Sequence, residues 1–127
     1  MGQREAAFGR FVKNLRIRND IGLREFCKRV KVDPSNWSKV ERGIIPAPKK
    51  DNVLELSAET LRLERGSDER AQFFDLAALS QNSLPPDLTE GEFVGKLPAF
   101  FRTIRKSGVT ARELDKIIET IRTAHQP

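Results

Sequence analysis

The chain has 127 residues, of which 38% are hydrophobic and 32% are charged, and its formal net charge is +5. This composition fits a soluble globular protein and excludes a disordered chain, and no apolar run approaches the ~20 residues that cross a bilayer. Because Cys27 is the single cysteine, an intrachain disulfide and a thiolate metal cluster are excluded, and we expect a reducing cytoplasm and no membrane.

The first fifty residues predict three short helices. The first has a regular apolar face, made by Phe8, Phe11, Val12 and Leu15. The second carries a shorter face, made by Leu23, Phe26, Cys27 and Val30. Asp33 can accept an N-cap hydrogen bond and Pro34 suits the first position of a third helix, which runs to Arg42 and stops at Gly43.

Two prolines in residues 44–48 predict a loop before a fourth helix over residues 49–63. The inward positions of that helix are Val53, Leu56 and Leu61. Ser67 can cap a fifth helix. Its apolar positions include Phe73, Leu76, Ala77 and Leu79. Residues 80–88 then form a polar connector that contains two prolines.

Helical spacing returns in residues 93–104, where we expect Pro98 to start a new helix or to kink one. Thr110 and Glu113 have the spacing of a capping box, which predicts the start of a last helix. The apolar side of that helix is made by Leu114, Ile117, Ile118 and Ile121. No strand pattern is visible, so the sequence predicts an all-α protein.

Residues 23–42 have the sequence form of a helix-turn-helix, whose second helix enters the major groove of DNA. On a helix that begins at Pro34, Trp37 and Val40 turn inward. The outward positions are Ser35, Ser38, Lys39 and Arg42. Small polar side chains allow a close approach to base edges, and a lysine can donate to guanine. We therefore interpret Trp37 as a core anchor rather than as a platform for base stacking.

The charge is distributed unevenly along the chain. Residues 1–50 contain 13 Lys/Arg and 5 Asp/Glu (13 − 5 = +8), whereas residues 51–127 contain 10 Lys/Arg and 13 Asp/Glu (10 − 13 = −3). A basic head is typical of a nucleic-acid-binding domain. A basic surface that is merely solvated explains the charge alone equally well.

Residues 8–62 resemble the Cro/C1-type (XRE) helix-turn-helix domain of phage repressors and bacterial regulators. The resemblance rests on Leu15-Arg16, Phe26-Cys27, Val30, Val32, Trp37, the ending Val40-Glu41-Arg42-Gly43, and Pro48. It implies an all-α fold with a lambda-repressor-like helix-turn-helix bundle over residues 1–65. A small helical C-terminal extension would then cover residues 66–127.

The same resemblance implies the roles of individual residues. Ser35, Ser38 and Lys39 would contact DNA bases. The phosphate contacts would come from Arg24, Asn36, Arg42 and Lys49, together with backbone N–H groups near Leu23. Arg16 and Glu41 match a pair that forms an internal salt bridge in relatives. The chain departs from the family at Leu23, where glutamine is frequent, and at Lys31, where a left-handed conformation without glycine would be strained by about 1 kcal/mol.

Residues 64–127 are similar to the C-terminal extension of a subgroup of small bacterial XRE-type regulators. We expect their apolar positions to complete the core and to form a symmetric dimer. Such a homodimer would hold two recognition helices ~34 Å apart on a palindromic operator. The alternative is a region that only caps the DNA-binding bundle within one chain.

These features lead us to expect a cytoplasmic, bacterial or phage-encoded transcriptional regulator, most simply a repressor bound to double-stranded DNA. The alternative is an antitoxin-type autoregulator whose C-terminal half binds and neutralises a protein partner. An enzyme is not expected, because His125 is the single histidine and Cys27 lies on an inward face. We expect no metal and no cofactor. RNA binding is disfavoured because there is no tyrosine and the phenylalanines follow core spacing.

Overall fold

The computed structural model describes residues 3–125. These residues form seven α-helices and one short 3-10 helix, with no strand among them, which confirms the predicted all-α class. No helix in the described part of the chain has the combination of length and apolar character needed to cross a bilayer. The chain divides into two compact units, residues 1–86 and residues 87–127.

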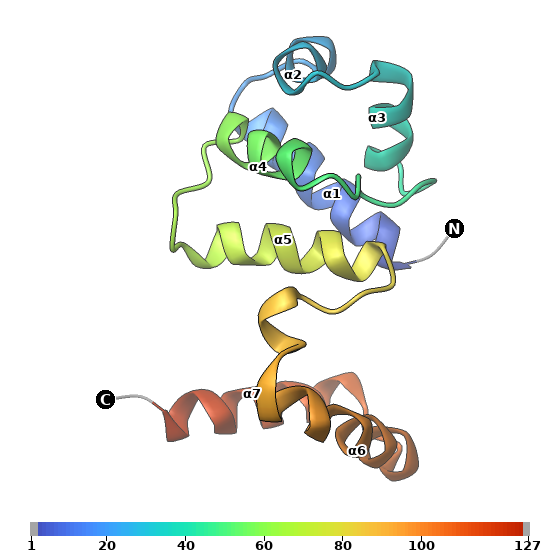
Figure 1. Ribbon diagram of the computed structural model, residues 1–127, viewed down its shortest axis with the longest axis vertical. Helices are drawn as coiled ribbons and strands as arrows, with labels where there is room; N and C mark the ends of the chain where they lie inside the picture. Colours follow the sequence, from blue (N-terminus) through green and yellow to red (C-terminus); the bar gives the residue numbers. More distant parts are fainter. Residues whose placement is uncertain (1–2, 126–127) are drawn as a thin grey trace. The chain divides into compact units, whose positions relative to one another are not determined.

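The first unit contains five helices (Figure 1): α1 (Gln3–Arg18), α2 (Leu23–Val30), α3 (Pro34–Glu41), α4 (Asp51–Thr60) and α5 (Asp68–Ser80). Four of them lie where the sequence predicts them. The fourth is shorter than the predicted span of residues 49–63, because Lys50 is its N-cap and Arg62 adopts a left-handed backbone with a φ of 60°. The helix therefore ends before the predicted boundary.

The core of this unit is built from apolar side chains of all five helices. Its largest fully buried members are Trp37, Phe8, Phe26, Phe73, Leu61, Val12 and Val30. Burying a large apolar side chain contributes roughly 1.5–3 kcal/mol, so these residues dominate the stability of the unit. Leu54 and Leu63 are buried although the predicted faces do not include them, and Leu79, one of the apolar positions of the fifth helix, is 41% exposed.

Helix α5 belongs to the first unit, whereas we expected the C-terminal extension to begin at residue 66. The reason lies in its packing on α1, where the rings of Phe73 and Phe8 lie 5.5 Å apart and are both fully buried. Arg70 of α5 is also buried, donates to the carbonyl of Leu63 at 3.1 Å, and pairs with Glu55 of α4. The first unit therefore continues to residue 86.

The end of α5 holds the loop that precedes α4. The Ser80 hydroxyl accepts the buried N–H of Ala47 at 3.0 Å and donates to the carbonyl of Ala77 at 2.8 Å. The side-chain amide of Gln81 donates to the carbonyl of Pro48 at 2.6 Å. Because buried backbone groups need partners, these bonds determine the path of the loop.

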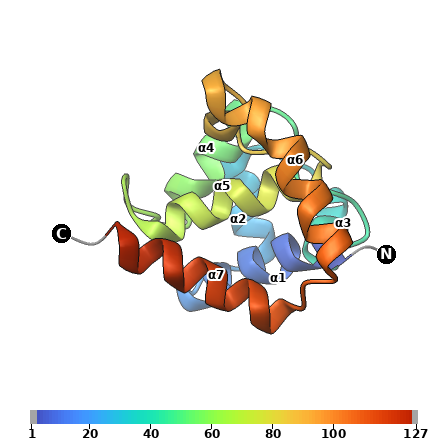
Figure 2. The ribbon, with the colours of Figure 1, turned by 90° about the horizontal axis from the view of Figure 1, so that it is seen from below.

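The second unit contains α6 (Gly91–Ser107) and α7 (Ala111–Ala124), preceded by a 3-10 turn at Pro86–Leu88. The predicted capping box is present: the N–H of Glu113 donates to the Thr110 hydroxyl at 3.2 Å, and the Glu113 carboxylate accepts the Thr110 N–H at 3.3 Å. Pro98 does not start a new helix, because α6 continues through it. Figure 2 shows α6 and α7 diverging from the turn that joins them.

Candidate nucleic-acid interface

Helices α2 and α3 form a helix-turn-helix, joined by a short turn at residues 31–33. Lys31 ends α2 in the left-handed conformation, with φ 64° and ψ 47°. The N–H groups of Lys31 and Val32 both donate to the carbonyl of Cys27, and this closes the last turn of the helix. The left-handed lysine agrees with the conformation considered for this position, where a β-carbon is strained by about 1 kcal/mol.

The first turn of α3 is capped by its own sequence. The Asp33 carboxylate accepts the N–H of Asn36 at 2.9 Å, and Pro34 occupies the first helical position. A carboxylate at this point also interacts favourably with the helix dipole. As a result, α3 begins where the sequence predicts it.

The inner side of α3 is anchored by Trp37. Its side chain is 1% exposed, and its ring centroid lies 5.0 Å from that of Phe26 in α2. The indole N–H donates to the Glu41 carboxylate at 3.0 Å, so its polar atom is satisfied inside the protein. Trp37 is thus a structural contact between the two helices of the motif.

Glu41 connects the same helix to α1. Nε and Nη2 of Arg16 donate to the two Glu41 carboxylate oxygens at 2.9 and 2.8 Å, and Nη1 of Arg16 donates to the carbonyl of Ile21 at 2.9 Å. Hydrogen bonding to Glu41 raises the pKa of the Arg16 guanidinium, which stays charged. A bidentate ion pair has a defined geometry, so this pair restricts the rotation of α3 about its axis.

The end of α3 lies directly against the backbone of α1. A β-carbon placed on Gly9 would lie 2.3 Å from the carbonyl oxygen of Val40 and 2.6 Å from that of Glu41. Gly43, with a φ of 75°, would place a β-carbon 2.8 Å from the Cα of Ala6. Glycine is therefore required at both positions, because the neighbours are main-chain atoms.

With this inner side fixed, the outer side of α3 faces solvent. Ser35, Lys39 and Arg42 are exposed and follow one another at spacings of four and three residues, on the side of the helix opposite Trp37. Asn36 is also exposed, whereas Ser38 is half-buried on the flank and its carbonyl accepts Nε of Arg42 at 3.3 Å. The structure thus leaves four of the five predicted residues accessible and places Ser38 at the edge of the exposed side.

Two further predicted residues lie outside α3. Arg24 is exposed in the first turn of α2, whose N-cap residue, Gly22, has no side chain to satisfy the first backbone N–H groups. Lys49 is exposed in the segment that leads into α4. Both residues belong to the same unit as α3.

A shallow groove beside α3 collects polar residues from three segments. Its rim includes Lys31, Asn36, Lys49 and Lys50, and its apolar lining includes Trp37 and Pro48. Lys31 and Lys50 were not among the predicted contact residues. The repeated lysine at positions 49 and 50 and the isolated lysine in the turn were available signals, but only the fold places them at one groove.

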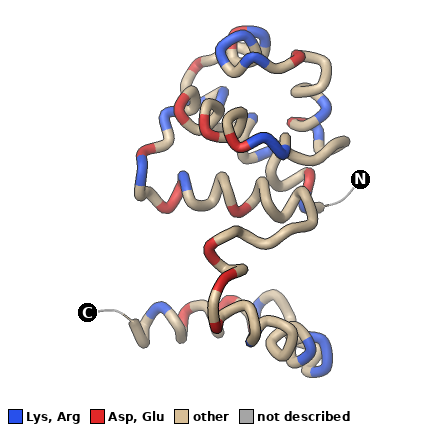
Figure 3. The backbone as a smooth tube through the Cα atoms, viewed as in Figure 1, with Lys and Arg blue, Asp and Glu red and all other residues tan. Residues whose placement is uncertain are grey.

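Positive charge is concentrated on this part of the molecule. Figure 3 shows Lys and Arg residues on α2, on α3 and in the segment that leads into α4. Thirteen of the 23 Lys and Arg residues lie in residues 1–50. A polyanion such as the DNA backbone is the ligand that this distribution attracts.

Cys27 contributes no reactive group to this surface. The Cys27 side chain is 1% exposed, and burial raises the pKa of its thiol to about 11, so the thiol is protonated at neutral pH. The chemistry available at the surface is therefore hydrogen bonding and cationic attraction.

In a comparison with protein families, the sequence model described as a helix-turn-helix domain matches residues 7–73, which is more than half of the chain. The matched segment extends from α1 to the buried Phe73 of α5. Comparisons with curated proteins and with solved structures find no match.

Proposed function

We propose, from the premise that this chain belongs to the helix-turn-helix domain family, that it is a sequence-specific DNA-binding regulator of transcription. The observation that carries the proposal is the two-sided character of α3. Its inner side is held by Trp37 and Glu41, and its outer side presents short polar and cationic side chains to solvent. A helix of this kind fits the major groove.

We assign base reading to Ser35, Ser38 and Lys39. Lys39 is the principal reader, because an exposed ammonium group can donate to O6 and N7 of guanine. The two serines are short enough for the helix to approach the base edges closely. Ser38 is half-buried, so its proposed contact is at the margin of the groove.

Arg24, Asn36, Arg42 and Lys49 are proposed to hold phosphates. They are exposed, and they are distributed over the start of α2, the two ends of α3 and the segment before α4. Contacts from several segments fix the orientation of a domain on the duplex but carry no sequence information. The uncapped first turn of α2 can add backbone N–H groups to the same phosphate contacts.

We further propose that the regulator binds a palindromic operator as a homodimer and acts as a repressor. Two copies related by a two-fold axis would present two α3 helices to successive major grooves, about 34 Å apart. A dimer bound to an operator that overlaps a promoter would exclude polymerase from that DNA. The proposed setting is the cytoplasm of a bacterium, from a bacterial or phage gene.

A second candidate is an antitoxin-type autoregulator whose C-terminal unit binds a partner protein. The observation that favours it is the exposure of large apolar side chains on α6 and α7, such as Phe93 at 53% and Ile121 at 57%. Both candidates share the DNA-binding unit and involve binding rather than catalysis. They differ in the molecule that covers the exposed apolar side chains of the second unit, which is a second copy in the first candidate and a partner protein in the second.

The test is a selection of bound duplexes from random DNA, followed by titration of the selected duplex and a shuffled duplex of equal length. We expect a repeated, inverted half-site and an affinity at least 10³-fold higher for the selected duplex, in the range of specific regulators. Equal affinity for the two duplexes at every salt concentration would contradict sequence-specific binding. A selected site without inverted repeats would contradict the palindromic operator alone.

A further inference from the structure

The second unit has an apolar face that nothing in its own helices covers. Among the described residues, twelve large hydrophobic side chains are exposed, and nine of them lie in this unit. They are Leu88, Phe93, Val94, Phe100, Phe101, Leu114, Ile117, Ile118 and Ile121. No residue of α6 or α7 is buried. The closely packed helix pairs of the described chain all belong to the first unit.

The exposed residues form one continuous stripe on each helix. On α7, Leu114, Ile117, Ile118 and Ile121 follow at spacings of three, one and three residues, which places them on one side. On α6, Phe93, Phe100 and Phe101 are joined by the half-buried Leu97 and Ile104. An apolar hollow lined by Phe100, Phe101, Ile104 and Leu114 connects the two stripes.

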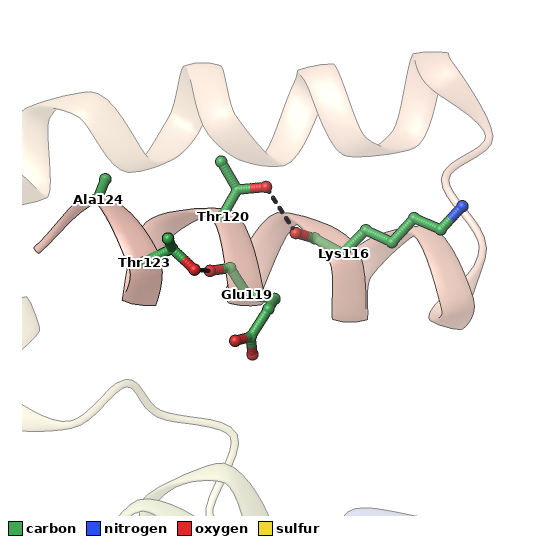
Figure 4. Close-up of a pocket in the computed structure, with 5 residues that line it drawn as sticks. All are labelled: Lys116, Glu119, Thr120, Thr123 and Ala124. Carbon is green, nitrogen blue, oxygen red and sulfur yellow. Dashed lines mark hydrogen bonds between the residues drawn. The ribbon is translucent and has the colours of Figure 1, made fainter. Parts of the chain in front are cut away.

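The opposite side of α7 is polar. Lys116, Glu119, Thr120, Thr123 and Ala124 line a hollow along this helix (Figure 4). The hydroxyls of Thr120 and Thr123 donate to the carbonyls of Lys116 and Glu119, each at 2.9 Å, within the helix itself. This side carries Lys116 and Glu119 and no large hydrophobic residue, so a partner would cover the isoleucine stripe and leave the threonines accessible.

We infer that the apolar stripes of α6 and α7 are covered by the same stripes of a second copy of this chain, and that the second unit gains its core only in that dimer. The inference rests on the homodimer proposed above and names the surface that forms it. Two copies of a two-helix unit supply four helices, which is enough for a bundle with an enclosed core.

The size of the unit is the first argument. A segment of about 40 residues rarely supports a core without disulfides, a metal or oligomerisation. The single cysteine lies in the first unit, and the described residues hold no cluster of side chains suited to a metal ion. Packing against a further protein surface remains as the means of stabilising the unit.

The exposed area is the second argument. The three exposed phenylalanines, at 53, 48 and 38%, together present on the order of 300 Å². With the four aliphatic side chains of the α7 stripe the apolar area is on the order of 600 Å², against the ~800 Å² that each partner buries in a standard stable interface. Such an area is at the upper end of the range for the largest patch of a typical monomer, about 300–600 Å², and patches of this size are often functional.

Among the surfaces of this chain, the apolar stripes of a second copy are the ones that match the stripes of this unit in apolar character. The large hydrophobic residues exposed on the described part of the first unit are Ile17, Ile44 and Leu79, which lie on three separate segments and form no comparable stripe. The second unit itself has seven Lys/Arg and six Asp/Glu, a net charge of 7 − 6 = +1. Self-association therefore meets little electrostatic repulsion, and the apolar stripes complement each other by two-fold symmetry.

The experiment uses the full chain and two spectroscopic signals. Trp37 is the single tryptophan and lies in the first unit, so its fluorescence reports on that unit alone. Sedimentation velocity and far-UV circular dichroism are recorded over a dilution series. We expect a dimer that dissociates on dilution with loss of helix signal, while the Trp37 emission stays unchanged.

The variants are Ile118→Lys and, as a matched control on the polar side of the same helix, Thr123→Lys. We expect Ile118→Lys to weaken the dimer at least tenfold and Thr123→Lys to leave it as in the unmodified chain. Unchanged Trp37 emission in both variants would show that the first unit is folded, so a monomer would not be a consequence of general unfolding.

Three outcomes would overturn the inference. The unmodified chain could be a monomer with constant helix signal at every concentration, or Ile118→Lys could dimerise as tightly as Thr123→Lys. The chain could also be purified as a monomer bound to a different protein that Ile118→Lys releases. Titration with a duplex that carries one half-site is a separate readout: failure to bind it would contradict DNA binding and leave the dimer surface standing.

Discussion

Arg16 and Glu41, 25 positions apart in the chain, form a two-pronged ion pair whose side chains are 11% and 6% exposed. The pair joins α1 to α3, and the same carboxylate accepts the indole N–H of Trp37. One carboxylate therefore bonds both to α1 and to the core side of the helix proposed to read DNA.

Removing that carboxylate should be strongly destabilising. We expect Glu41→Ala to lower the free energy of unfolding by about 3–5 kcal/mol, because Arg16 is left as an uncompensated buried charge. Urea unfolding followed by circular dichroism measures the change. The double variant Arg16→Met/Glu41→Leu should be more stable than Glu41→Leu alone; if it is less stable, the buried charge is not the cause. Arg18→Ala, which breaks the exposed pair with Glu69, is the control that should change little.

The contact between α1 and α3 predicts the effect of one added methyl group. Gly9→Ala should lower the free energy of unfolding by about 1–3 kcal/mol, because the new β-carbon overlaps main-chain oxygens that cannot turn away. Gly95→Ala in α6 is the matched control, since a β-carbon there meets no atom within 4 Å. A helical alanine in place of glycine should stabilise by about 0.5–1 kcal/mol. Equal effects at the two positions would contradict the close approach.

Lys39→Ala tests base reading. We expect a loss of about 1–3 kcal/mol of binding free energy on the selected operator, with relaxed preference at one base pair. Fluorescence anisotropy with operator variants at that position measures both effects. A loss of the same size on shuffled DNA would assign Lys39 to phosphate contact instead.

Arg42→Ala should behave differently. Because a phosphate contact carries no sequence information, binding should weaken on all duplexes, and the slope of log K against log salt should fall by about one. Titrations at several salt concentrations measure the slope. An unchanged slope together with a changed base preference would place Arg42 among the base-reading residues.

The end of α5 should influence DNA binding at a distance. Ser80→Ala leaves the buried N–H of Ala47 without its partner, which should cost about 1–3 kcal/mol of stability. The loop that carries Lys49 should also loosen, so affinity should fall on all duplexes alike. Ser83→Ala is the control: it removes a hydrogen bond to the carbonyl of Ala78 at the same helix end but no partner of the loop. Unchanged affinity in Ser80→Ala would show that the loop does not need this anchor.

Much of the local structure was readable from short stretches of sequence. Asp33 with Pro34 starts α3, and Thr110 with Glu113 starts α7, because each cap depends on residues within one helical turn. The apolar spacing of the first three helices also predicted their buried faces, including Trp37. These features follow from the 3.6-residue period of a helix.

The proposed contact surface was only partly accessible to the same reasoning. The pattern in residues 34–42 predicts an outer side of α3 opposite Trp37. In the structure, the exposed residues of α3 lie on that side. Lys31 and Lys50 are neighbours of Lys49 at one groove because the turn and the loop meet there in space. No local spacing contains that information.

The sequence by itself determined where helices begin and which side of each is apolar, since these properties depend on neighbours a few residues away. Tertiary structure alone decided that α5 belongs to the first unit, because Phe73 packs on Phe8 and Ser80 holds Ala47 across 33 positions. It also decided that the apolar stripes of α6 and α7 have no cover within their own unit. Burial depends on contacts between residues distant in the chain, and periodicity cannot say which surface supplies them.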